Sequence, residues 1–118
     1  MTITPGNYDI TIYQGSTFSQ LFTWQDQNNA LVNLIGYTAR MMARASVDSV
    51  SPFITLTTEN SGIALGGAAG TITLSMSAAQ TAALVAQSGI YDLEVVSGSG
   101  QVTRLLEGNL MVSAEVTR

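Results

Sequence analysis

The sequence predicts a mainly β domain, an antiparallel β-sandwich with one short α-helix, and three observations support this fold class. Apolar and polar residues alternate with a period of two in short runs through most of the chain. Clusters rich in Gly, Asn and Ser separate these runs at intervals of roughly 8 to 12 residues, the rhythm of a sandwich or a barrel. The chain has 118 residues, 46% of them hydrophobic, which suffices for one core but not comfortably for two domains.

The first half of the chain predicts four strands. Residues 8–13 and 17–25 alternate on either side of a turn at 14–16, where Gly15 allows a positive φ. Residues 37–46 and 53–58 resume the alternation after polar loops. Good helix formers occupy 37–46, but strict alternation favours a strand there. The residues predicted to face the core are Tyr8, Ile10, Ile12, Phe18, Phe22, Trp24, Tyr37, Ala39, Met41, Ala43, Ala45, Ile54 and Leu56.

The second half predicts shorter strands and the single helix. Residues 63–70 are small and glycine-rich and predict a tight bend, which is followed by a strand at 71–75. Ser77 and Gln80 match a capping box, so we expect a helix that runs to Ala86, with Gly89 as its stop, and that covers an end of the sandwich or crosses between sheets. Strands follow at 90–96, at 102–106 after a hairpin turn at 97–100, and after Gly108. The inward residues predicted there are Ile72, Leu74, Tyr91, Leu93, Val95, Leu110, Val112, Ala114 and Val116.

These elements predict an immunoglobulin-like sandwich organised as one unit. Residues 1–7 precede the first alternating run and form an N-terminal arm, which we expect to be free to reach a neighbouring subunit. Residues 8–118 form the single β-sandwich domain, because neither an internal repeat nor a linker divides them.

The residue types argue against an enzyme. The sequence contains no Cys, no His and no Lys, and its four cations are all arginine. Without these residues there is no side chain that titrates near neutral pH unperturbed, no thiolate and no Schiff-base nucleophile. Zinc, haem and iron–sulfur sites also lack their usual ligands. We therefore expect no enzymatic activity, no cofactor, no metal and no small-molecule substrate.

Charge and hydropathy point to protein partners. The net charge is −4, so no basic surface for a nucleic-acid backbone is expected. The first residues have no signal-peptide pattern, and no run of 18 apolar residues predicts a membrane span. Only 10% of residues are charged, far fewer than in an average soluble domain. This favours a surface that partners cover, with a neutral Ser/Thr surface as the alternative interpretation.

Four groups of side chains are candidate sites, and each has a simpler structural interpretation. Asp92 and Glu94 share a strand face, as a carboxylate pair for glycoside hydrolysis would, but they also suit cross-strand pairs with arginines. The loop 26–29 offers oxygen ligands for Ca²⁺ or a plain polar turn, and Ser77 is explained as a helix cap. Trp24 would form a sugar-binding platform with Tyr13 and Tyr37, but its register predicts a core position. Tyr13 is out of register and is the better candidate for an exposed contact.

The order of several short motifs resembles a β-sandwich domain of tailed bacteriophages. That domain occurs at the N-terminus of siphophage upper baseplate proteins and in stand-alone tail or head–tail proteins. This chain departs from the expected Asp-Leu-Thr-Gly corner at residues 33–36. The motifs are residues 14–17 before an aromatic strand, 33–38 before a strand with arginines, 70–75 before Gln80 and Thr81, 89–93, 104–108 and 116–118.

The resemblance implies a non-enzymatic virion protein, made in the bacterial host cytoplasm and assembled into the particle. Baseplate relatives continue into a helical, receptor-facing region, so a chain that stops at residue 118 would be an adaptor or accessory subunit of the tail, baseplate or head–tail region. It would help attach fibres or receptor-binding proteins, with other virion proteins and symmetric copies of itself as partners. A capsid decoration protein and a small carbohydrate-binding module are the alternatives. The predicted partner-contact residues are Met1, Thr2, Ile3, Thr4, Pro5, Tyr13, Arg40 and Arg44.

Overall fold

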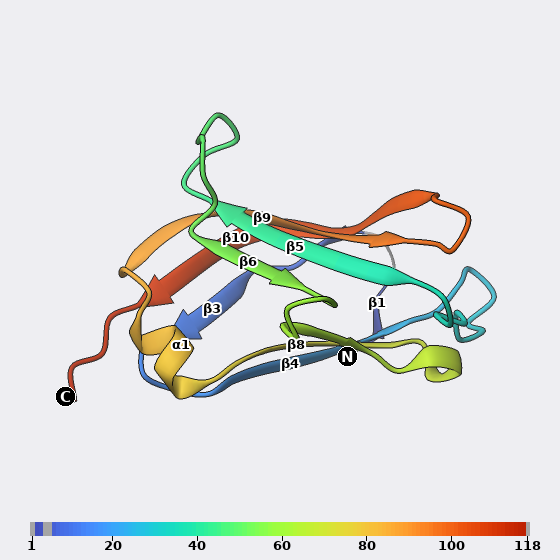
Figure 1. The fold of residues 1–118 in the computed structure, drawn as a ribbon, viewed down its shortest axis with the longest axis horizontal. Helices are drawn as coiled ribbons and strands as arrows, with labels where there is room; N and C mark the ends of the chain where they lie inside the picture. Colours follow the sequence, from blue (N-terminus) through green and yellow to red (C-terminus); the bar gives the residue numbers. More distant parts are fainter. Residues whose placement is uncertain (1, 4–5, 118) are drawn as a thin grey trace.

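Two β-sheets pack face to face in the computed structural model, which describes residues 2–3 and 6–117 (Figure 1). The sheet named here the β4 sheet has the order β1 (Thr2–Ile3), β4 (Phe18–Trp24), β8 (Thr71–Met76) and β7 (Ile63–Leu65). The β9 sheet has the order β2 (Gly6–Asn7), β10 (Val102–Ser113), β9 (Gln87–Val96), β5 (Thr38–Arg44) and β6 (Ile54–Thr57), with β3 (Ile10–Tyr13) also paired to β10. The predicted sandwich with one short helix is confirmed.

The N-terminal segment is part of both sheets, so the expectation of a free arm is wrong for its described residues. Thr2 and Ile3 of β1 pair in parallel with the end of β4, and Gly6 and Asn7 of β2 pair in parallel with β10. Unpaired strand edges leave backbone donors and acceptors unsatisfied, which the arm remedies at two edges of its own domain. The predicted contact residues Met1, Thr4 and Pro5 lie outside the described residues.

The core lies between the sheets and follows the predicted alternation closely. Phe22, Met41, Ile72, Leu74 and Leu93 are all at most 1% exposed. Each occupies one of the alternate positions of its strand that were predicted to face the core. Tyr91 is also buried, and its hydroxyl donates a hydrogen bond to the carbonyl oxygen of Tyr8, which fixes the chain between β2 and β3. Burial raises the pKa of this phenol far above its ordinary value.

Three residues expected in the core lie outside it. Ala45, Ala114 and Val116 are exposed, and Val116 reaches 92%. β5 ends at Arg44 and β10 at Ser113, so these residues continue the alternation in sequence but follow the last paired position of each strand. Beyond that position no sheet face is present to bury them.

The helix α1 (Ala78–Ala82) begins where predicted and ends early. Ser77 Oγ accepts from the Gln80 backbone N–H at 3.1 Å, and Gln80 Oε1 accepts from the Ser77 N–H at 2.8 Å, so the capping box is confirmed. α1 connects β8 to β9 and thus crosses between the sheets, as expected. It was predicted to extend to Ala86, but β9 already starts at Gln87, which pairs with Val112.

Gly89 is a strand residue rather than a helix stop. A Cβ at this position would lie 2.2 Å from the carbonyl oxygen of Arg44, so the glycine allows β5 and β9 to approach each other.

The predicted break at Gly108 is also wrong, because β10 continues through it as one strand with a bulge between Arg104 and Leu106. The predicted bend at 63–70 contains β7 and a short 3₁₀ helix, Gly67–Ala69. Within the described residues, no helix is long and apolar enough to span a membrane.

Candidate interaction surfaces

The two sheets differ sharply in charge. The strands of the β4 sheet contain no Asp, Glu, Lys or Arg. The strands of the β9 sheet contain six charged residues, namely Arg40, Arg44, Asp92, Glu94, Arg104 and Glu107. Since a sandwich has two outer faces, the domain presents one face with mixed charge and one whose strands carry none.

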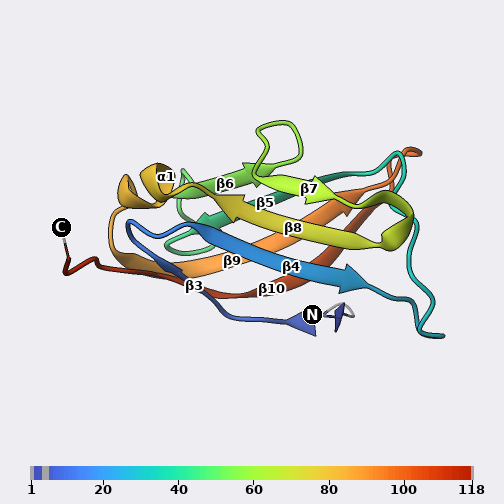
Figure 2. The ribbon, with the colours of Figure 1, turned by 90° about the horizontal axis from the view of Figure 1, so that it is seen from below.

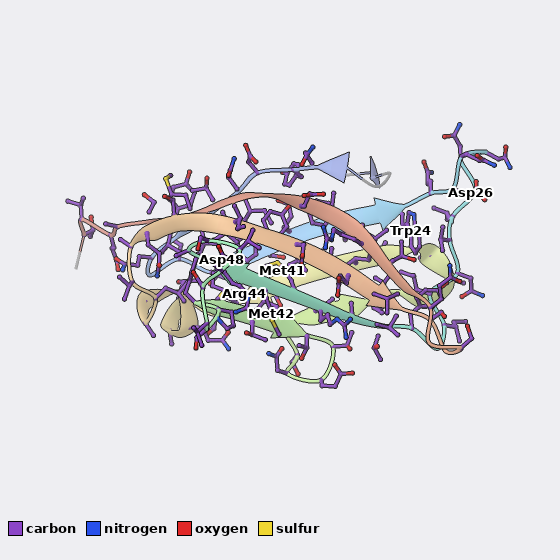
Figure 3. The ribbon with its side chains drawn as sticks, turned by 90° about the horizontal axis from the view of Figure 1, so that it is seen from above. Trp24, Asp26, Met41, Met42, Arg44 and Asp48 are labelled. Carbon is purple, nitrogen blue, oxygen red and sulfur yellow. The ribbon has the colours of Figure 1, made fainter. Side chains whose placement is uncertain are left out.

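The charged face of the β9 sheet is hollowed. A shallow groove of about 800 Å³ runs over β5, β9 and β10, with Met42 and Ile90 as apolar residues of its floor. Figure 3 looks onto this face and labels Met42 and Arg44 along β5. Their neighbour Met41 is buried. The groove combines half-exposed apolar side chains with both signs of charge.

Carboxylates and arginines on this face pair with one another. Arg40 Nε lies 2.8 Å from Glu94 Oε1 across β5 and β9, and Arg104 Nε lies 3.6 Å from Asp92 Oδ2 across β9 and β10. Burial raises the pKa of Asp92, and the carboxylates of Glu94 and Glu107 raise it further, while Arg104 opposes them. The interpretation of Asp92 and Glu94 as part of a cross-strand charge network is confirmed. Arg40, a predicted partner contact, is held by Glu94.

Arg44, the other predicted contact on this face, orders a loop of its own chain. Its guanidinium donates to the carbonyl oxygens of Ser49 at 3.1 Å and Val50 at 3.2 Å. These bonds hold the β5–β6 loop so that Val47 and Val50 project into solvent, 79% and 96% exposed. Sequence reasoning treated this loop as a connection only. The available signal was two valines in a loop otherwise rich in Ser.

On the uncharged face of the β4 sheet, mostly Ser and Thr side chains lie opposite one another on neighbouring strands. Ser19 pairs with Ser75, Leu21 with Thr73, and Thr23 with Thr71 across β4 and β8. Leu21 lies in the middle of β4 and is 45% exposed. Figure 2 looks onto this face, and no described helix or strand crosses in front of β4, β8 and β7. Its polar groups are therefore hydroxyls, presented on a regular surface.

The outer edge of β6 is occupied by a side chain. Asn60 Oδ1 accepts from the backbone N–H of Thr57 at 2.8 Å and of Gly62 at 2.9 Å, and Asn60 Nδ2 donates to the carbonyl of Thr55 at 3.0 Å. The amide thus takes the place of a neighbouring strand along β6. This blocks the edge against pairing with another chain.

For the remaining candidate residues, the structure supports the simpler structural interpretation. Trp24 is half-buried and packs edge-on against Tyr37, with ring centroids 6.4 Å apart, so its predicted core role is confirmed. Tyr13 is 60% exposed at the end of β3, as predicted. Asp26 Oδ1 accepts from the N–H groups of Asn28 and Ala30, which makes residues 26–30 a polar turn. Within the described residues, no group of three or more His, Cys, Asp or Glu is placed to hold a metal ion.

The fold is an immunoglobulin-like β-sandwich, and a comparison with solved structures bears this out. The chain is similar to a chicken TCR crystal structure with a TM-score of 0.54 and 10% sequence identity. The similarity covers 98% of this chain and 56% of the TCR chain, so this chain spans little more than half of that protein. No protein-family model and no curated protein matches the sequence. The likeness to the TCR shows the fold alone, and the phage resemblance stays a prediction.

Proposed function

We propose that this protein is a non-enzymatic structural subunit of a tailed-bacteriophage virion, an adaptor or accessory protein of the tail, baseplate or head–tail region. The observation that carries the proposal is the segregation of charge between the two sheets. An isolated soluble domain normally distributes charge over its whole surface to remain soluble. A sheet whose strands contain no charged residue suits a domain that is packed among other subunits.

The positions of the exposed apolar residues support the same role. Ile35, Val50 and Val85 are 71%, 96% and 70% exposed, and each lies in a connection between strands rather than on a sheet. Loops at the ends of a rigid sandwich are the usual place for contacts with partners. The order of motifs that resembles phage tail domains favours a virion as the assembly.

The use of the carboxylates favours a structural role over glycoside hydrolysis. Asp92 and Glu94 lie on a shallow sheet face and pair with arginines of neighbouring strands. A glycosidase needs two carboxyl groups on either side of a bound sugar, in a cleft deep enough to hold it. A carbohydrate-binding module is likewise less well supported, because Trp24 is half-buried and packs against Tyr37.

The test is the protein composition of purified virions from the source of this sequence. We expect mass spectrometry to find the chain in particles purified through a density gradient, in a fixed ratio to the other tail proteins. Gold-labelled antibodies against it should mark the tail or the head–tail junction in electron micrographs. Labelling over the whole capsid would favour the decoration protein instead. Absence from the particles would overturn the virion role.

A further inference from the structure

We propose that the uncharged face of the β4 sheet is a contact between two copies of this chain, packed face to face about a two-fold axis. The face is formed by Ser19, Leu21 and Thr23 of β4, Thr71, Thr73 and Ser75 of β8, and Ala64 of β7. The inference deepens the proposed function, on which it rests, by assigning one of the contacts with copies of itself to particular residues.

The chemistry of this face is complementary to that of a second copy. In a two-fold contact the same patch faces itself, so each row of side chains must be complementary to the rows of an identical patch. A row of arginines or carboxylates is not complementary to itself, because like charges would meet. A row of hydroxyls is complementary to itself, because Ser and Thr each donate and accept a hydrogen bond.

The register of β4 and β8 gives the arrangement of such a pair. Leu21 and Thr73 form the central row, with the serine row Ser19–Ser75 on one side and the threonine row Thr23–Thr71 on the other. A two-fold axis through the central row and perpendicular to the strands places each serine row against the partner's threonine row. Leu21 of one copy then packs close to Leu21 of the other, and no charged residue of these strands enters the contact.

The opposite face does not fit the same arrangement. Arg104, Glu94 and Arg40 form one row of the β9 sheet, and Glu107 and Asp92 lie opposite each other in the next. If that face packed against a copy with the same axis between these rows, Glu94 would meet Asp92 of the partner. Buried like charges oppose association.

The size of the face indicates a weak contact. A strand of six residues spans about 20 Å, and three strands about 4.8 Å apart add about 10 Å, so the patch is well below the ~800 Å² per partner of a standard interface. Such a contact is populated where many copies are held side by side, as in a virion, and only at high concentration in free solution.

Cross-linking through a single introduced thiol tests the contact, because the chain contains no cysteine of its own. Thr73→Cys places the thiol at the centre of the uncharged face. Thr11→Cys is the matched control, a half-buried threonine in the middle of β3 on the other sheet. With a short bismaleimide at high protein concentration, we expect Thr73→Cys to give dimer at least about tenfold faster than Thr11→Cys, after correction for the labelling rate with a monofunctional maleimide.

A second variant shows whether the contact itself brings the thiols together. Leu21→Arg in the Thr73→Cys chain should reduce cross-linking to the level of Thr11→Cys. Met111→Arg should not, although it adds the same charge at a similarly exposed site, 47% against 45%. An arginine beside a thiol favours the reactive thiolate, so a fall in cross-linking cannot come from thiol chemistry. If Leu21→Arg lowers the thermal stability, Ser19→Arg on the same strand replaces it.

The inference is overturned if Thr73→Cys and Thr11→Cys cross-link equally, or if an arginine on the uncharged face leaves the rate unchanged. Either result leaves the composition of purified virions untouched, so failure of this contact is distinguishable from failure of the proposed function.

Discussion

At the scale of single residues, Asn60 has the most concentrated set of hydrogen bonds in the β6–β7 connection. Its side chain satisfies the backbone at Thr55, Thr57 and Gly62, and its own N–H donates to Thr57 Oγ1 at 2.9 Å. The next residue, Ser61, has a positive φ of 68°, a conformation that few residues other than glycine adopt. The Asn60 amide therefore stabilises a strained turn and also occupies the outer edge of β6.

We predict that Asn60→Ala destabilises the protein by about 2 kcal/mol, because two backbone donors and one acceptor lose their partner. Asn60→Asp is the matched control, since its carboxylate still accepts from Thr57 and Gly62, although it loses the bond donated to Thr55 and turns an oxygen toward that carbonyl group. We expect it to cost less than Asn60→Ala. Urea denaturation followed by tryptophan fluorescence measures both. Equal free energies of unfolding for wild type and Asn60→Ala would contradict this account of the turn.

Asp92 gives a pH dependence whose sign follows from its environment. Burial raises its pKa above the ordinary value of 3.8, so the folded protein binds this proton more tightly than the unfolded chain. The ionised carboxylate therefore lowers stability at neutral pH. This cost disappears as the pH falls through the folded-state pKa and below the unfolded-state pKa.

We predict that Asp92→Asn is slightly more stable than wild type at pH 7, within about 0.5 kcal/mol, and that the difference shrinks on acidification. Glu94→Gln should change stability in the opposite direction at pH 7, because it breaks the 2.8 Å ion pair with Arg40. Urea denaturation at pH 7 and near pH 3.5 provides the comparison. A loss of stability in Asp92→Asn at pH 7 would show that its pairing with Arg104 outweighs the burial of the charge.

At the scale of elements, the packing of β9 against β5 depends on Gly89. A Cβ there would meet the Arg44 carbonyl oxygen at 2.2 Å, and backbone atoms cannot move aside as the end of a flexible side chain can. We predict that Gly89→Ala costs more than about 2 kcal/mol, since the clash must be relieved by separating two strands. Gly98 lies in the β9–β10 turn, and Gly98→Ala should be close to neutral, because its Cβ would lie 3.5 Å from the nearest atom, the carbonyl oxygen of Gly36. Thermal unfolding of the two variants distinguishes a steric role from the general effect of losing a glycine.

The elements also show where sequence reasoning succeeds and where it ends. The inward residues of β4, β5 and β9 were predictable because burial on one face imposes a period of two on each strand. The end of α1, the continuity of β10 through Gly108 and the exposure of Val116 depend on where a partner strand stops, and that is set by residues far away in the chain. The parallel pairing of Thr2 and Ile3 with β4 is non-local in the same way.

For the candidate surfaces too, local features could be predicted from the sequence and features that depend on topology could not. The pairing of Asp92 and Glu94 with arginines followed from cross-strand spacing, and the exposure of Tyr13 followed from register. The separation of charge between faces could not be inferred strand by strand, because it depends on which strands share a sheet. β4 and β8 are far apart in the sequence, and only the topology places their Ser and Thr residues on one surface.

At the scale of the whole molecule, this separation predicts how self-association responds to salt. Each copy carries a net charge of −4, so two copies repel each other at long range, and added salt screens that repulsion. If the contact is the uncharged face, no ion pair across it is weakened, and association should strengthen modestly between about 50 mM and 500 mM NaCl. If the contact were the β9 sheet, attraction between Arg40 or Arg104 and the partner's carboxylates would be screened and association should weaken.

Sedimentation velocity at high protein concentration and neutral pH measures the direction of this change. We expect the weight-average sedimentation coefficient to rise with salt for the wild type and for Met111→Arg, and to stay at the monomer value for Leu21→Arg. Because Leu21→Arg and Met111→Arg reduce the net charge equally, a difference between them reports the position of the contact and not the charge of the molecule. A sedimentation coefficient that falls with salt would assign self-association to the charged face and contradict the pairing of the β4 sheets.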